Sequence, residues 1–306
     1  MERDFLTIDD VSPKELDHLL ELAVEVKRSP GDFASRLTGM SVALIFEKPS
    51  TRTRVSLEVA VASAGGHPLA LSSSELQLGR GETIEDTGRV LSRYCQAIVL
   101  RTFGQERLEA LAAGATVPVV NSLSDYEHPC QILADLLTVK ESKGDPAGQI
   151  VAYLGDGNNV AHSLLLGGAM LGMRMRVATP MGFEPIPQIV ERASEIASEA
   201  GGSIEVGNDA QAAAEGADVL YTDVWASMGQ EREHDERVLV FTPYRLDSDK
   251  VTRAADDVIV MHCLPAHRGE EITDEVIDGP HSVVWDQAEN RLHTQKALLL
   301  WLLGRE

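Results

Sequence analysis

The stretch Ser41–Arg54, SVALIFEKPSTRTR, decides the fold of the first half of the chain. Its first six residues are an apolar run of strand length, and a helix-like pattern begins at Thr51 after a short polar turn. A buried strand followed directly by a helix is the first half of a βαβ unit, in which the next strand runs parallel to the first. The stretch therefore predicts a parallel sheet.

Strand-like and helix-like runs alternate from here to the end of the chain, which is typical of parallel sheets with helices on both faces. Strands are predicted at residues 41–46, 68–71, 97–101, 117–121, 150–154, 176–178, 203–206, 219–222, 258–261 and 282–285. Helices are predicted to begin at Thr51, Thr83 and Gln105, to run from about Pro129 to Ser142, and to close the chain from Glu289 to Leu303.

The polar segment 143–148, KGDPAG, divides this pattern into two series. A chain of 306 residues also exceeds the usual size of a single core. We therefore predict two domains, 1–147 and 148–288, and a C-terminal helix, 289–306, that packs back on the first domain. The expected fold class is α/β, with a mainly parallel sheet and helices on both faces in each domain, and interdomain helices that join them.

The chain is strongly acidic, with 48 acidic and 27 basic residues and a formal net charge of −21. Nucleic acid is not an expected partner, because binding to phosphate backbones needs a basic surface. The acidic residues are dispersed, as at Glu191, Glu195 and Glu199, and only seven of the 27 basic residues are lysines. Two interpretations stay open: a solubilising surface, or the salt-adapted surface of a halophile, which we favour.

The sequence also predicts a cytoplasmic protein without membrane contact. Its longest uncharged run, 157–173, contains polar residues and is shorter than the roughly 20 apolar residues of a membrane span. The N-terminus lacks the basic and apolar regions of a secretory signal. Three widely spaced cysteines, Cys95, Cys130 and Cys263, are an odd number, which argues against a disulfide framework.

The turn after the first strand is a candidate phosphate site. In KPSTRTR, residues 48–54, the backbone N–H groups and hydroxyls at the start of a helix face the carboxyl end of the strand. Arg52 can offer a bidentate guanidinium to phosphate oxygens. A helix N-cap alone would need one hydroxyl and no arginine. Two arginines among three hydroxyls therefore favour anion binding.

A second strand-to-helix turn, GDGNNV at residues 155–160, invites comparison with nicotinamide-binding proteins. The dinucleotide fingerprint needs a third glycine where Val160 stands, and an acidic residue about 20 positions further on. The chain has only Val177–Pro180 there. No cofactor is therefore predicted, and a dehydrogenase is excluded.

Five segments together resemble the carbamoyltransferase family, and within it the ornithine carbamoyltransferases. In order along the chain they are Ser50-Thr51-Arg52-Thr53-Arg54, His128-Pro129-Cys130-Gln131, Asp156-Gly157-Asn158-Asn159-Val160, Asp223-Val224-Trp225-Ala226-Ser227-Met228-Gly229 and His262-Cys263-Leu264-Pro265. The first two segments are similar to the carbamoyl phosphate half of the family, and the last three to the amine half that distinguishes ornithine from aspartate.

The resemblance implies that one set of residues binds carbamoyl phosphate and activates its carbonyl. Arg101, His128 and Cys263 would be the catalytic residues, with Arg101 bridging phosphate and carbonyl. Gln77 would reach in from a neighbouring subunit, so a homotrimer or a multiple of trimers is expected. The full implied carbamoyl phosphate set is Ser50, Thr51, Arg52, Thr53, Gln77, Arg101, His128, Gln131, Cys263, Leu264 and Arg291.

The resemblance also implies the ornithine site: Asn159, Asp223, Ser227 and Met228 would hold the amino-acid end of L-ornithine. The expected reaction is direct attack of the neutral side-chain amine on the carbamoyl carbon, followed by loss of phosphate. A covalent role for Cys263 is the alternative. No metal is expected, because Asp223 serves as the ammonium partner and the thiols Cys130 and Cys263 belong to opposite halves.

Three rival functions fit the sequence less well than ornithine carbamoylation. A carbamoyltransferase for putrescine, aspartate or an acylated ornithine is disfavoured by Asp223 and by the segment Ser227-Met228-Gly229. An inactive binding or scaffold protein is disfavoured by the complete set of phosphate ligands. A nicotinamide-dependent dehydrogenase is excluded because the dinucleotide fingerprint at residues 155–160 is incomplete.

Overall fold

The structure is a computed structural model that describes residues 3–72, 81–226 and 234–306. Within these ranges, no helix is long and apolar enough to cross a membrane.

The chain folds into two compact units, Met1–Leu137 with Asn290–Glu306, and Thr138–Glu289. It passes from one unit to the other within α5 (Pro129–Lys143) and again within α12 (Val284–Leu302). The first crossing therefore lies inside a helix, before the polar segment at which the sequence places the domain boundary.

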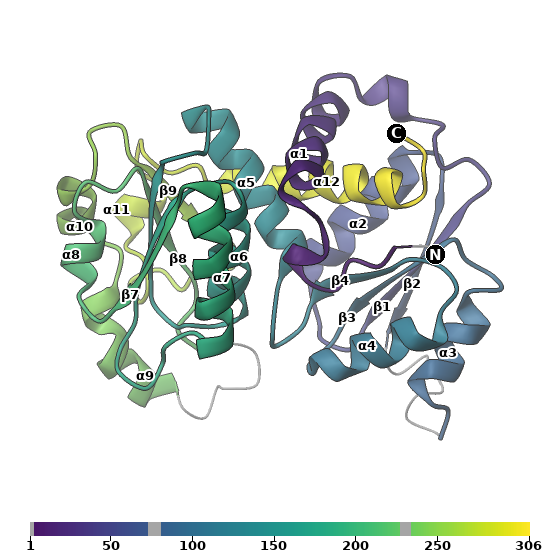
Figure 1. Cartoon of the computed structure of the whole chain (residues 1–306), viewed down its shortest axis with the longest axis horizontal. Coiled ribbons are helices and arrows are strands. Elements are labelled where there is room, and N and C mark those ends of the chain that lie inside the picture. Colours follow the sequence, from purple (N-terminus) through teal and green to yellow (C-terminus); the bar gives the residue numbers. More distant parts are fainter. Residues whose placement is uncertain (1–2, 73–80, 227–233) are drawn as a thin grey trace. The chain divides into compact units, whose positions relative to one another are not determined.

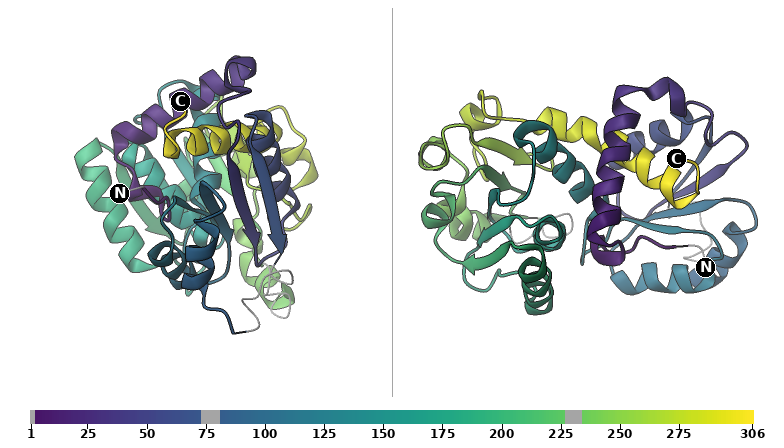
Figure 2. Two further views of the ribbon diagram at one scale, coloured as in Figure 1. Left: turned by 90° about the vertical axis from the view of Figure 1, so that its right-hand side faces the viewer. Right: turned by 45° about the horizontal axis from the view of Figure 1, so that its top comes forward.

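The first unit contains a four-stranded parallel sheet in the order β2-β1-β3-β4. Helices α1, α2 and α12 cover one face, and α3 and α4 cover the other (Figure 1; Figure 2). Every residue of β3 is buried, as expected for a strand covered on both faces. The elements are η1 (Ile8–Asp10), α1 (Pro13–Arg28), η2 (Pro30–Phe33), β1 (Ser41–Phe46), α2 (Thr51–Ser63), β2 (His67–Ser72), α3 (Ile84–Leu91), β3 (Ala97–Arg101), α4 (Gln105–Gly114) and β4 (Val119–Leu123).

The two ends of the chain meet in the first unit, where α1 and α12 lie side by side (Figure 2). Lys27 Nζ donates to Asn290 Oδ1 over 2.8 Å, and the guanidinium of Arg3 lies 5.0 Å from the ring centroid of Trp301. These contacts fix α12 against the N-terminal helix.

The second unit contains a five-stranded parallel sheet in the order β7-β6-β5-β8-β9. Helices α6 and α7 cover one face, and α8, α10 and α11 cover the other (Figure 1). The elements are β5 (Ile150–Leu154), α6 (Asn159–Met170), β6 (Arg174–Ala178), α7 (Pro187–Ala200), β7 (Ser203–Gly207), α8 (Ala210–Ala214), β8 (Val219–Thr222), α9 (His234–Phe241), η5 (Thr242–Tyr244), α10 (Ser248–Arg253), β9 (Ile259–His262) and α11 (Asp274–Ile277).

The α/β class is confirmed, and nine of the predicted strands are present to within two residues at either end. The tenth, at 282–285, is wrong. Ser282 forms only an isolated bridge with Val260, and the chain is helical from Val284, before the predicted helix start at Glu289. Short apolar runs fit a strand or a buried helix start equally well. Here the side chain of Gln287 in the helix accepts the His262 N–H at 2.9 Å, where a further strand would supply a carbonyl.

Each sheet reverses its strand order beside its first strand. The chain builds outward from β1 to β2 and then returns to place β3 on the other side, and β5 has β6 and β8 as its two neighbours. Ligands of open parallel sheets bind at the carboxyl ends of the strands beside such a reversal, because the flanking loops diverge there. The loops after β1 and β3, and after β5 and β8, are therefore the expected ligand positions.

Helices α3 and α4 touch backbone to backbone. A Cβ atom on Gly114 would lie 2.2 Å from the Glu85 carbonyl oxygen, and one on Gly88 would lie 2.7 Å from the Leu111 carbonyl oxygen. Neither position has room for a methyl group, because backbone atoms cannot swing aside as a flexible side chain can.

Gly114→Ala should therefore destabilise the protein by about 1–3 kcal/mol, the usual cost of overpacking a rigid contact. The measurement is urea unfolding followed by far-ultraviolet circular dichroism. Gly31→Ala is the control, because a Cβ there meets nothing within 4 Å. Equal stability of the two variants would contradict the close packing of α3 on α4.

Candidate active site

The first candidate site begins at the N-terminus of α2. Ser50 is the N-cap, with an extended backbone, and its hydroxyl accepts the Thr53 N–H at 3.2 Å. Thr51 and Arg52 are exposed, whereas Thr53 is buried. The site thus combines the positive end of a helix dipole with an exposed guanidinium next to it.

Two buried arginines from distant parts of the chain belong to the same unit. Arg101 is the last residue of β3 and is in register with Phe46, the last residue of β1. Arg291, on α12, donates from its Nη2 to Thr53 Oγ1 over 2.7 Å. Because the Thr53 hydroxyl accepts this bond, its own proton can be donated to a ligand.

His128 precedes α5 and is neutral. Burial holds its pKa well below the usual 6.5, and the guanidinium groups of Arg291 and Arg101 lower it further. A neutral imidazole has one N–H donor and one acceptor nitrogen. His128 can therefore donate a hydrogen bond to a carbonyl without adding a positive charge.

Cys130 and Gln131, in the first turn of α5, differ in their ability to bind a ligand. Gln131 Nε2 donates to Asp135 Oδ1 over 2.8 Å, and its buried Oε1 accepts no hydrogen bond from the described residues. Cys130 Sγ donates to the Asn121 carbonyl at 3.3 Å, and burial raises its thiol pKa to about 12. Gln131 can still bind an amide, whereas Cys130 is an unreactive buried thiol.

Lys48 is a further candidate site residue, which was not among the predicted ones. Its side chain is buried, its Nζ pairs with Asp125, and it lies 4.3 Å from the centroid of the Phe103 ring. Its position in the KPSTRTR turn is the sequence feature from which it could have been predicted. Because Asp125 balances its charge, Lys48 adds little to the net positive charge of this unit.

The second candidate site begins at the GDGNNV turn after β5. Asn158 is the N-cap of α6, and its Oδ1 accepts the Val160 and Ala161 N–H groups at 2.9 and 3.2 Å. Its Nδ2 donates to Asp223 Oδ2 over 2.8 Å. Asn158, which the sequence analysis did not single out, thus joins the loop after β5 to the loop after β8. The predicted Asn159 is the half-buried first residue of α6.

The glycine of this turn has a steric role. A Cβ on Gly157 would lie 2.3 Å from the Pro185 backbone nitrogen. The glycine permits close backbone approach within the protein, which explains its presence without a dinucleotide.

Asp223 and Cys263 are in direct contact. Cys263 Sγ donates to Asp223 Oδ1 over 2.8 Å, and the Val224 N–H donates to the same oxygen over 2.8 Å. The carboxylate thus holds the sulfur as a protonated thiol, which disfavours a covalent role for it.

His262 orders the segment that follows β9. Its Nδ1 accepts the Leu264 N–H at 2.8 Å, so the proton resides on Nε2, which lies 3.1 Å from Glu271 Oε1. Leu264 has φ +57°, a left-handed conformation that a leucine adopts only when its surroundings hold it, and the Leu264–Pro265 peptide is cis. Both nitrogens of His262 are occupied, so it is not the base that a nucleophilic Cys263 would need.

The ligand atoms of Asp223, His262 and Cys263 lie within 4.8 Å of one another, the spacing of a metal site. A metal ion on His262 would have to displace one of its two hydrogen bonds, and one on Cys263 would have to displace the bond to Asp223.

Arg237 and Asp156 form a buried ion pair that the sequence analysis missed. Arg237 Nη2 lies 2.5 Å from Asp156 Oδ2, Arg237 Nε donates to the Trp225 carbonyl, and the guanidinium lies 4.8 and 5.1 Å from the ring centroids of Phe183 and Phe241. Burial raises the pKa of Asp156 to about 6, although Arg237 opposes the shift. This cluster ties Trp225 to α9.

The predicted site residues that the structure describes divide between the two units. Gln77, Ser227 and Met228 lie outside the described residues. The first unit carries Ser50, Thr51, Arg52, Thr53, Arg101, His128, Gln131 and Arg291, and the second carries Asn159, Asp223, Cys263 and Leu264.

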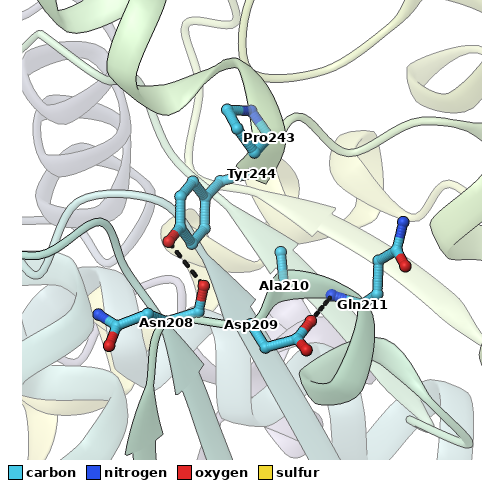
Figure 3. Close-up of a pocket in the computed structure, with 6 residues that line it drawn as sticks. All are labelled: Asn208, Asp209, Ala210, Gln211, Pro243 and Tyr244. Atoms are coloured by element: carbon cyan, nitrogen blue, oxygen red, sulfur yellow. Dashed lines mark hydrogen bonds between the residues drawn. The ribbon is translucent and has the colours of Figure 1, made fainter.

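A separate hollow of about 610 Å³ lies at the carboxyl end of β7, lined by Asn208, Asp209 and Tyr244 among others (Figure 3). Tyr244 Oη donates to the Asn208 carbonyl at 2.7 Å, and Asp209 caps the Gln211 N–H at 3.0 Å. Its polar groups thus bond one another, and it contains none of the predicted residues.

Known proteins resemble this chain over its full length. Residues 3–141 match the family described as aspartate/ornithine carbamoyltransferase, carbamoyl-P binding domain, and residues 147–302 match its Asp/Orn binding domain. The ornithine carbamoyltransferase of Parafrankia sp. (strain EAN1pec) is 62% identical over 304 residues, 98% of this chain and 96% of that protein.

Solved structures agree. Ornithine carbamoyltransferase from Pyrococcus furiosus has a TM-score of 0.96 at 53% identity, over 99% of this chain and 97% of that chain. The enzyme from Gloeobacter violaceus has a TM-score of 0.90 at 49% identity, over 99% of both chains. This chain belongs to the aspartate/ornithine carbamoyltransferase family.

Proposed function

We propose that this protein transfers the carbamoyl group of carbamoyl phosphate to the side-chain amine of L-ornithine, giving L-citrulline and phosphate, or catalyses the reverse reaction. One observation carries the proposal. The KPSTRTR turn after β1 and the GDGNNV turn after β5 each lie beside the reversal of strand order in their sheet. The unit that matches the carbamoyl-P binding domain carries cationic groups there, and the unit that matches the Asp/Orn binding domain carries Asp223.

The phosphate of carbamoyl phosphate binds at the N-terminus of α2. Ser50, Thr51 and Thr53 offer hydroxyl and backbone donors, and Arg52 offers a bidentate guanidinium. The exposure of Arg52 supports this role, because a guanidinium with a purely structural task is usually paired within the protein. Gln77 completes the phosphate ligands.

The carbamoyl group is polarised by Arg101, His128 and Thr53. As the amine attacks, negative charge develops on the carbonyl oxygen, and these three donors stabilise the tetrahedral intermediate. The neutral state of His128 suits a donor that must not compete with Arg101 for the phosphate. Gln131 and Arg291 hold the carbamoyl amide in place, and phosphate leaves when the intermediate collapses.

L-Ornithine binds through Asn159, Asp223, Ser227 and Met228. A carboxylate in a nearly buried position is a suitable partner for an ammonium group. The Asn158 amide and the Cys263 thiol each donate to the Asp223 carboxylate, which fixes its orientation before the substrate arrives.

The reactive amine must lose a proton before it attacks. A lysine-like amine with a pKa of about 10.4 is almost entirely protonated at neutral pH. Cys263 and the Leu264 carbonyl accept hydrogen bonds from this amine and orient it, and Asp223 assists the loss of the proton. Cys263 acts without a covalent bond, because its thiol proton is held by Asp223.

The assembly and setting of the protein are also proposals. We infer a cytoplasmic homotrimer or a multiple of trimers, in which Gln77 serves the site of a neighbouring subunit. Exposed apolar side chains on α2, at Val55 and Val59, support burial of this face between copies of the chain. The dispersed acidic surface supports adaptation to high salt.

Arg52→Ala should raise the KM for carbamoyl phosphate about ten- to hundredfold, because hydrogen bonds to charged groups contribute about 1.5–3 kcal/mol each. The measurement is steady-state citrulline formation from carbamoyl phosphate and ornithine. Arg89→Ala is the matched control, because Arg89 pairs with Asp86 on α3, outside the phosphate-binding motif, and its removal should leave this KM almost unchanged.

The same assay separates the proposal from its rivals. Wild-type protein should carbamoylate ornithine and not aspartate, putrescine or an acylated ornithine. An absence of citrulline with all variants would favour a binding protein, and an unchanged KM in Arg52→Ala would refute the phosphate assignment.

Removal of salt should dissociate and inactivate the protein. The screening length grows from about 3 Å at 1 M salt to about 30 Å at 0.01 M, so the excess carboxylates of a chain with net charge −21 would repel one another. Sizing, activity and thermal unfolding in molar and millimolar potassium chloride measure this effect. An intact, active oligomer with the same Tm in dilute buffer would exclude salt adaptation.

A further inference from the structure

A tight turn brings together three possible metal ligands, His267, Glu270 and Glu271, none of which is a proposed substrate residue. Gly269, with φ +86°, permits the turn, which is closed by the bonds Glu270 N–H to the His267 carbonyl at 2.9 Å and Gly269 N–H to the Ile272 carbonyl at 2.8 Å. His267 Nδ1 then lies 3.7 Å from Glu270 Oε2 and 4.0 Å from Glu271 Oε2. One ligand atom from each residue lies within 4.8 Å of the other two.

These spacings are close to those of a zinc site. Zinc bonds of about 2.0–2.2 Å in tetrahedral geometry place ligand atoms roughly 3.4 Å apart. Small rotations of the half-exposed His267 and Glu270 side chains would close the difference, while the buried Glu271 stays in place.

Glu271 supplies an independent observation. Its side chain is fully buried, and its Oε1 accepts hydrogen bonds from His262 Nε2 and from the His267 N–H. Its Oε2 is also buried, yet accepts no hydrogen bond from the described residues. A buried carboxylate oxygen without a partner costs free energy, so a cation on that side would stabilise it.

A protonated His267 does not supply the missing hydrogen bond to Glu271 Oε2. The separation of 4.0 Å between Nδ1 and Glu271 Oε2 exceeds a hydrogen bond. The neighbouring Arg268 is directed elsewhere, because its guanidinium binds Asp274 and Asp278 at 2.8 and 2.5 Å.

We propose that His267, Glu270 and Glu271 bind a divalent transition-metal ion of the zinc type, with water in the remaining position. One imidazole nitrogen and two carboxylate oxygens are suitable zinc donors, whereas calcium and magnesium prefer oxygen alone. Three protein ligands leave one position of the tetrahedron open.

The site is linked to the segment that contains Cys263. Glu271 would bind the metal through Oε2 while Oε1 keeps its bond to His262, whose Nδ1 accepts the Leu264 N–H. Such outer hydrogen bonds orient ligands in metal sites. Metal binding would therefore stiffen the His262–Leu264 segment.

The test is calorimetric titration of Zn²⁺ into chelator-treated protein, with enough potassium chloride to screen the acidic surface. We expect one site per chain, and at least about tenfold weaker binding in His267→Ala and in Glu270→Gln. Two control variants should bind as the wild type does: Glu275→Gln, which removes a nearby acidic group outside the turn, and His67→Ala, which removes an exposed histidine of the other unit.

Co²⁺ as a spectroscopic probe separates this site from the Asp223–His262–Cys263 cluster. Cobalt on nitrogen and oxygen donors gives visible bands without the intense near-ultraviolet charge-transfer band of a cobalt thiolate. The proposal is overturned if a thiolate band appears with the first equivalent, if neither variant weakens binding, or if neither metal binds. Circular dichroism of each variant excludes misfolding as the cause of lost binding.

Discussion

The direction of parallel strands is the constraint on which both halves of the proposed site depend. All carboxyl ends of a parallel sheet lie at one edge, and two loops diverge only where the strand order reverses. In the first unit this occurs beside β1, followed by the α2 N-terminus, and in the second beside β5, followed by the Asn158 cap. Residues distant in sequence, such as Asn158 and Asp223, are thereby brought within 2.8 Å.

Electrostatics then distinguishes two otherwise similar units. In the first, Arg101 and Arg291 are buried, and they contribute to the neutrality of His128. In the second, Asp156 and Asp223 are buried in the loops after β5 and β8; Arg237 pairs with Asp156, and burial and Asp223 both raise the pKa of Asp156. A concentrated positive charge selects an anion such as a phosphate, and a buried carboxylate selects an ammonium group. The same architecture therefore suits two substrates of opposite charge.

The sequence was most informative where local pattern and function coincide. The strand and cap around Ser50 have a local signal, so their prediction needed no tertiary knowledge. Arg237 and Glu271 have none: each acts through a partner distant in sequence or in a loop, and only the folded chain shows that pairing. The strand predicted at 282–285 was wrong for the same reason. The His262 N–H bonds to the side chain of Gln287, a tertiary contact that the local sequence pattern does not show.

A crystal structure with bound carbamoyl phosphate tests the central claim most directly. The account predicts the phosphate at the N-terminus of α2, within hydrogen-bonding distance of Ser50, Thr53 and Arg52, with the carbamoyl oxygen facing Arg101 and His128. The GDGNNV turn after β5 is the other strand-to-helix turn with an anion-binding appearance. A phosphate bound there, with the α2 N-terminus empty, would contradict the assignment of carbamoyl phosphate to the first unit.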